Sequence, residues 1–231
     1  MTWNEGLYEY ARTHCLEYFG DEAEDTLLGA MTNTYDWNGI LLSPEEPFLV
    51  QCKAYSAGRG GLGYEIRVLL RCTLDRDYFL EISGGNRARA GVNTVKRQLD
   101  KVSERFGVDL HDDYGCPEVT ANRKIRTSDP AFTAMVFRDP EFRQMLTKHP
   151  EFSLRAAKNA PRQSDDPRHL ITVSAFPDIT HWALNETEAL ETEEDRRRHL
   201  ETFEKELDAL IAAGKAALSA LTAWRMPPKS S

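Results

Sequence analysis

The chain has 231 residues, of which 41% are hydrophobic and 29% charged, and its formal net charge is -8. This composition excludes a wholly disordered chain, and the length suits one large α+β domain or two smaller ones. The negative charge repels nucleic acid and anionic membranes, so neither is expected as a partner. The amino terminus has no basic start followed by an apolar run, and no stretch approaches the roughly 20 apolar residues of a membrane span. We therefore expect a cytoplasmic protein of bacterial type.

The cysteines indicate a reducing compartment. Cys15, Cys52, Cys72 and Cys116 are widely spaced and form no Cys-x-x-Cys pair. Neither a disulfide framework nor a zinc knuckle fits this spacing, so we expect reduced, buried thiols. No metal and no cofactor are predicted.

The first part of the chain predicts helices followed by strands. Apolar residues recur at three- and four-residue spacing over 3–19, which is typical of a helix, and a shorter helix is expected over 22–31. Short strands are predicted at 40–42 and 48–55. The glycines at 58, 60, 61 and 63 lead into a further strand. They therefore predict a flexible turn between strands rather than a phosphate loop, which would lead into a helix.

The stretch from Tyr64 to Ser83 is rich in β-branched and aromatic residues and is interrupted by Asp75, Arg76 and Asp77. Such an interruption is typical of a tight turn, so we predict a β-hairpin with arms at about 64–74 and 78–83. Alternation in the first arm predicts one buried and one solvent-facing side of the sheet.

A basic segment follows these strands. Arg87 and Arg89 lie between the glycines at 84–85 and a helix predicted from about 92 to 106. A strand that leads through glycines into a helix can hold an anion, so Arg87 and Arg89 are candidate anion-binding residues. The alternative, a solvated helix face balanced by acidic residues, is favoured because no further motif supports a site.

Residues 107–122 are rich in turn formers and mark the expected boundary between two halves, 1–110 and 111–231. This segment holds His111, Asp113 and Cys116, residue types that can act as a nucleophile with its base or as metal ligands. They are the candidate catalytic residues of a hydrolase or transferase, joined in space by Asp178 or His181. An acidic surface turn is the favoured alternative.

The second half predicts a strand at 124–127, a helix starting at Ser128-Asp129-Pro130 and a break at Asp139-Pro140. Strands at 152–157 and 169–176 follow, separated by a polar loop. The longest helix is expected over about 192–225, and its apolar stripe is predicted to pack on the sheet rather than self-associate.

Together these elements define an α+β fold with antiparallel sheet built on hairpins, covered by amphipathic helices, with a long carboxy-terminal helix. One continuous sheet of about six strands and two separate sheets both satisfy the pattern. The similar order of elements in the two halves raises the hypothesis of a structural duplication.

For function, the sequence favours a non-enzymatic module that binds a partner protein or a small molecule. Its acidic surface suits basic partners, including toxins that it would neutralise. The alternatives are the hydrolase or transferase using the His111–Cys116 segment, and a structural homodimer formed through the carboxy-terminal helix. A monomer and a homodimer both remain open.

Overall fold

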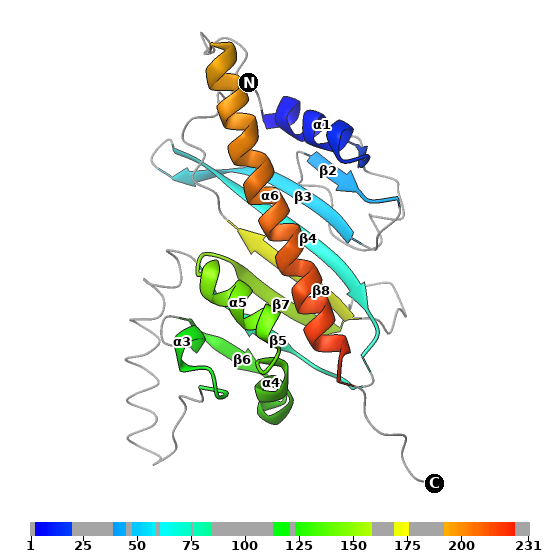
Figure 1. Ribbon diagram of the computed structural model, residues 1–231, viewed down its shortest axis with the longest axis vertical. Helices are drawn as coiled ribbons and strands as arrows, with labels where there is room; N and C mark the ends of the chain where they lie inside the picture. The colour runs from blue at the N-terminus through cyan, green and yellow to red at the C-terminus, as the bar shows by residue number, and fades with distance from the viewer. Residues whose placement is uncertain are drawn as a thin grey trace.

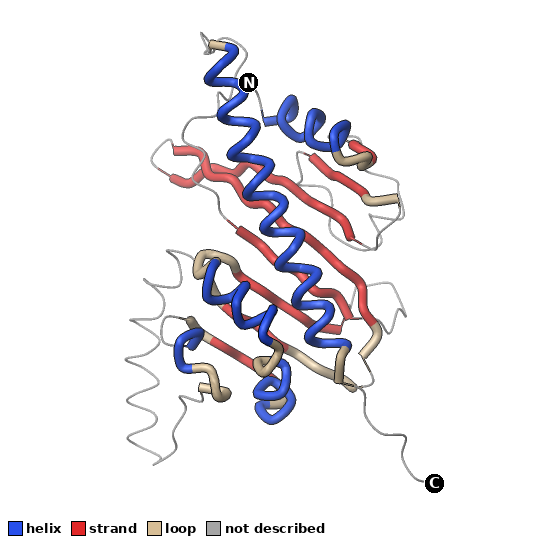
Figure 2. The backbone as a smooth tube through the Cα atoms, viewed as in Figure 1, coloured by secondary structure: helices blue, strands red, loops and turns tan. Residues whose placement is uncertain are grey.

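The computed structural model of the chain describes residues 3–19, 39–44, 48–58, 61–74, 76–84, 113–120, 123–158, 169–175 and 192–224. Within them, eight strands form one antiparallel sheet in the order β1-β2-β3-β4-β8-β7-β5-β6 (Figures 1 and 2). The strands are β1 (Glu17–Tyr18), β2 (Gly39–Leu42), β3 (Phe48–Gly58), β4 (Gly61–Cys72), β5 (Leu80–Ile82), β6 (Ile125–Thr127), β7 (Ser153–Lys158) and β8 (His169–Ala175). The predicted α+β fold with an antiparallel sheet is confirmed.

The alternating sequence of the strands gives the sheet one apolar face. Directly paired residues form a continuous row across six strands, and every member of it is at most 2% exposed. Because alternate residues of a strand point to opposite faces, their neighbours lie on the other side, where polar side chains predominate. The row consists of Leu41, Val50, Val68, Val173, Leu154 and Ile82.

The described helices contribute to the core on this apolar face (Figure 1). They are α1 (Trp3–Thr13), α3 (Pro117–Thr120), α4 (Pro130–Val136), α5 (Pro140–Lys148) and α6 (Glu193–Thr222). Asp129 and Asp139 cap α4 and α5. Their side chains accept hydrogen bonds from the backbone N–H groups of Phe132 and Phe142, respectively. The predicted helix start and the predicted break at 139–140 are thereby confirmed. Thr192 caps α6, as its sequence predicts.

The long helix α6 crosses the middle of the sheet and packs on β4 and β8 (Figure 1). The helix lies close to the sheet at Gly214, where an added Cβ would lie 2.6 Å from Leu70 Cδ1. The apolar stripe therefore lies in the core of its own chain, as predicted. Its buried members include Phe203, Leu207, Leu210, Ala213, Ala217 and Leu221.

One predicted pairing is wrong. The segments at 64–74 and 78–83 do not form a hairpin, because β4 pairs with β3 and β8, while β5 pairs with β6 and β7. The hairpin at this place is instead β3–β4, whose strands meet at Gly58 and Gly61. The predicted glycine turn between strands is thereby confirmed.

Two smaller differences concern segments near turns. The first helix ends at Thr13 rather than Phe19: Cys15 adopts a φ of 54°, and Glu17–Tyr18 pair with β2. A residue in the left-handed conformation ends a helix, and the residues that follow it here pair with the sheet as its edge strand. The single turn α3 lies in a segment that the sequence predicts to be irregular.

Strands from both predicted halves share the sheet. β4 pairs with β8, and β5 lies between β7 and β6. A duplication is not shown by this arrangement. The helices predicted at 22–31 and 92–106, the loop at 159–168 and the segment 177–190 lie outside the described residues.

His169 makes the stability of the sheet sensitive to acid. It is buried at the start of β8, and its Nε2 accepts a hydrogen bond from the Tyr78 backbone N–H (3.2 Å). Burial lowers the pKa of His169 below that of the unfolded chain, about 6.5. The unfolded state therefore takes up the proton first, and stability falls as the pH drops through about 6.5.

We expect His169→Gln, whose amide oxygen can replace Nε2 as acceptor, to reduce this acid sensitivity. Urea unfolding of both proteins at about pH 7.5 and about pH 5.5 measures it. A variant that loses as much stability as the wild type between these values contradicts the assignment.

Candidate functional site

The segment from His111 to Cys116 is described only from Asp113 onward. Asp113 is exposed, and its Oδ1 accepts from the Gly115 backbone N–H (2.8 Å) in a turn that leads into α3. Cys116 is 1% exposed, and its Sγ donates to Glu118 Oε1 (3.4 Å). His111 lies outside the described residues, so its pairing with Cys116 stays a prediction.

The surroundings of Cys116 do not favour a thiolate. Burial, and next its hydrogen bond to Glu118, raise the pKa of the Cys116 thiol. The Glu118 carboxylate is itself held ionised, because a hydrogen bond from Arg143 lowers its pKa to about 2. The thiol thus stays protonated beside a carboxylate, whereas a nucleophile requires the deprotonated form.

The other candidate residues cannot be placed. Arg87, Arg89, Asp178 and His181 all lie outside the described residues, so the anion-binding hypothesis remains a prediction. Among the residues that the structure describes, no three His, Cys, Asp or Glu side chains are grouped as metal ligands.

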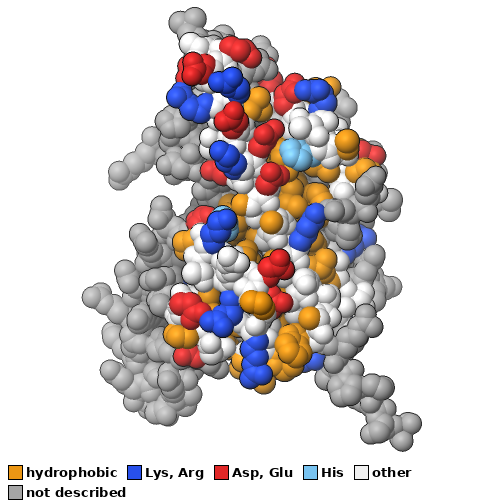
Figure 3. Space-filling view, in the orientation of Figure 1, with side chains coloured by type: hydrophobic (Ala, Val, Ile, Leu, Met, Phe, Trp, Pro, Cys, Tyr) orange, Lys and Arg blue, Asp and Glu red, His pale blue; other side chains and the backbone are white. Residues whose placement is uncertain are grey.

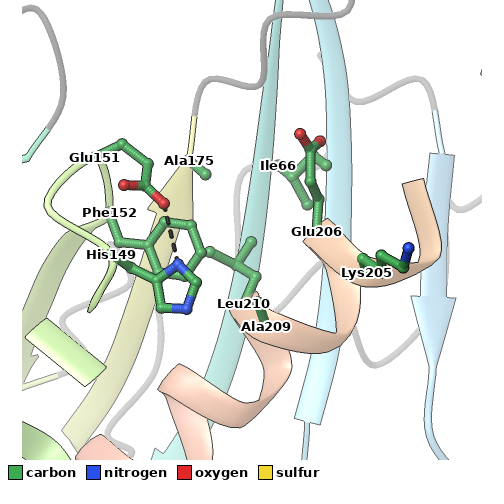
Figure 4. Close-up of a pocket in the computed structure, with 9 residues that line it drawn as sticks. All are labelled: Ile66, His149, Glu151, Phe152, Ala175, Lys205, Glu206, Ala209 and Leu210. Atoms are coloured by element: carbon green, nitrogen blue, oxygen red, sulfur yellow. Dashed lines mark hydrogen bonds and ion pairs between the residues drawn. The ribbon is translucent and has the colours of Figure 1, made fainter. Parts of the chain in front are cut away.

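The structure instead shows a cavity of about 280 Å³ beneath α6, which we call the α6 cavity (Figure 4). Its apolar lining comes from the sheet, the start of β7 and the underside of α6, and its polar lining comes from α6 and the turn between α5 and β7. The lining residues are Ile66, Phe152, Ala175, Ala209 and Leu210, together with His149, Glu151, Lys205 and Glu206.

One wall of the cavity is the turn that ends α5. The His149 ring stacks on Phe152 with centroids 4.5 Å apart and an interplanar angle of 6°. Its Nδ1 lies 3.1 Å from Glu151 Oε1, the hydrogen bond drawn in Figure 4. The turn closes through the Phe152 backbone N–H, which donates to the His149 carbonyl (3.1 Å).

A buried arginine holds this turn in place. Arg123, 8% exposed, donates to the carbonyl oxygens of Leu146 (2.8 Å), His149 (2.6 Å) and Phe152 (2.8 Å). Burial lowers its pKa to about 10, so the guanidinium is still charged at neutral pH. It satisfies carbonyls at the end of α5, where the helix dipole favours a cation.

A second hollow adjoins the first. The α5–α6 groove, of about 570 Å³, runs between α5 and α6 and shares His149 and Ala209 with the α6 cavity. Figure 3 shows this face of the molecule: acidic and basic side chains both crowd the amino-terminal half of α6, and apolar surface is more prominent lower down. The linings of the α6 cavity and of the α5–α6 groove both include acidic and basic side chains.

No pattern in the sequence indicates this site. Its residues come from β4, β8, α6 and the 149–152 turn, and contacts between segments distant in sequence, such as the pairing of β4 with β8, bring them together. The available local signal was the His-Pro-Glu run after α5, which predicts a helix end but not a cavity wall.

Compared with protein-family models, the chain matches none, and no curated protein matches it. None of the described helices is long and apolar enough to cross a membrane.

Proposed function

We propose that this protein is a non-enzymatic binding module that holds a small molecule, or a side chain of a partner protein, in the α6 cavity. The observation that supports the proposal is the cavity itself, an apolar hollow with polar side chains contributed by α6 and by the turn between α5 and β7. Its volume lies near the low end of small-molecule pockets, which are about 300–1,000 Å³.

The rigidity of the cavity walls suits a binding role. Ile66 and Leu210, both 1% exposed, belong to the sheet and to the long helix, so the apolar floor is preformed. The polar wall is held by the three hydrogen bonds of Arg123. A preformed site binds at a lower cost in conformational entropy than one that must be ordered.

We also propose that the protein works in the bacterial cytoplasm as an acidic partner of basic molecules. Its four cysteines are free thiols, three of them buried, which suits a reducing compartment. The net charge of -8 would speed encounters with positively charged partners.

Native mass spectrometry of the protein purified from its own host tests the proposal. Wild-type protein is expected to carry added mass, and Ala209→Phe, which fills the cavity from α6, is expected to lose it. The same change at the exposed helix cap, Ala223→Phe, is the control and should retain the added mass. A bare wild-type protein, with no partner above background in a pull-down, would overturn the proposal.

A further inference from the structure

Two of the four polar side chains that line the α6 cavity are carboxylates. Glu151 and Glu206 contribute carboxylates, which at neutral pH are acceptors only. They approach from different elements, Glu206 from α6 and Glu151 from the turn before β7.

His149 holds the carboxylate of Glu151 in place. The His149 Nδ1 donates to Glu151 Oε1 over 3.1 Å. In Figure 4 Nε2 lies on the side of the ring away from Glu151. Stacking on Phe152 fixes the plane of the ring, so the direction of its hydrogen bond to Glu151 is fixed as well.

The one lysine of the cavity lining does not change this character. Lys205 is exposed on α6, and Figure 4 shows its ammonium directed away from His149 and Glu151. A lysine at such a position keeps its charge in water while its aliphatic stem covers apolar surface.

The floor of the cavity is aliphatic and aromatic. Phe152 and Ala175 are 5% and 8% exposed and adjoin the buried Ile66 and Leu210. An anionic ligand would meet two carboxylates here, and a wholly apolar ligand would remove water from them without replacing its hydrogen bonds.

We infer that the α6 cavity binds an alkylammonium or alkylguanidinium group, with its aliphatic chain on the apolar floor and its cation between the carboxylates of Glu151 and Glu206. This inference rests on the proposed binding function and names the chemistry of its occupant. The group belongs either to a free amine or guanidine or to a lysine or arginine side chain of a partner protein.

Titration of the purified full chain with matched probes tests the inference. The probes are n-butylguanidinium, n-butylammonium and, as the anionic counterpart, pentanoate, followed by NMR shifts of the Ile66 and Leu210 methyl groups. The cations are expected to saturate these shifts, and pentanoate is expected to leave them unchanged. Equal or tighter binding of pentanoate overturns the inference.

A charge-removing variant supplies a second measurement. Glu206→Gln keeps the shape of the side chain and should weaken cation binding about tenfold or more, since hydrogen bonds to charged groups are the stronger ones. Glu201→Gln, at an exposed position of the same helix, is the control and should change it less than about twofold. Unchanged cation affinity in a folded Glu206→Gln protein contradicts the assignment.

Identification of the native occupant distinguishes a free amine or guanidine from a side chain of a partner protein. It also distinguishes a failure of this inference from a failure of the proposed binding function. Acid release of the added mass from wild-type protein should yield either a small amine or guanidine, or a protein with a protected lysine or arginine. An occupant that lacks both groups overturns the inference while leaving the binding function in place, provided that Ala209→Phe abolishes its binding.

Discussion

Arg123→Met is expected to lower the free energy of unfolding by about 3 to 5 kcal/mol. The guanidinium is 8% exposed and donates to three carbonyl oxygens, those of Leu146, His149 and Phe152. Methionine fills similar space but donates nothing, so buried carbonyls at the end of α5 lose their partners. Urea unfolding measures the change as a lower midpoint at an unchanged slope.

The matched control is Arg126→Met. Arg126 has a side chain that is 60% exposed, and its ion pair with Glu81 spans 3.3 Å, so its loss should cost less than about 1 kcal/mol. The loss of stability in Arg123→Lys should lie between those of the other two variants, because one ammonium group cannot reach all three carbonyl oxygens as the planar guanidinium does. An Arg123→Met protein as stable as the Arg126→Met protein would contradict this role of the guanidinium.

Arg123 also shows why the site was harder to predict than the fold. In sequence it precedes a short strand and has no distinguishing neighbours, and it contacts carbonyls 23 to 29 residues away. Nothing in a local pattern marks such a residue. The helix starts at Ser128-Asp129-Pro130 and Thr192, and the break at Asp139-Pro140, depend on neighbours within about three residues, and these were predicted correctly.

The hairpin at 64–74 and 78–83 was predicted incorrectly for the same reason, namely contacts between residues distant in sequence. Two alternating segments joined by Asp75–Asp77 favour a tight turn, but both edges of β4 are occupied, by β3 and β8. The chain instead crosses to the far side of β7, and Tyr78 secures the crossing through a 2.7 Å hydrogen bond to Thr133. Local alternation specifies strands, whereas their partners depend on contacts distant in sequence.

The site could be predicted only in part for this reason. The strands at 64–74 and 169–176, and the long helix, were all predicted, and each contributes a wall of the α6 cavity. Their meeting depends on the β4–β8 pairing, which no local pattern indicates. Of the catalytic candidates, Asp113 and Cys116 lie in the turn and the core beside α3, and neither lines the α6 cavity.

Gly84→Ala is expected to destabilise the protein by about 2 to 3 kcal/mol. A Cβ at this position would lie 2.0 Å from the Phe152 carbonyl oxygen and 2.7 Å from that of Glu151. These are backbone atoms, so no flexible side chain can move aside. The Gly84 N–H also donates to Ser153 Oγ (2.9 Å), which ties the end of β5 to the start of β7 at this point.

Gly115→Ala is the control for this prediction. Gly115 has a φ of 73° and nothing near its missing Cβ, so alanine there costs only the left-handed conformation, about 1 to 2 kcal/mol. The Gly84→Ala and Arg123→Met changes should moreover be non-additive, because both act on the Phe152 carbonyl. Additive losses of stability in the double variant would mean that the two contacts are independent. A smaller combined loss would mean that Gly84 and Arg123 jointly hold the Glu151–Phe152 wall, and that shifting it with either change should also weaken binding in the α6 cavity.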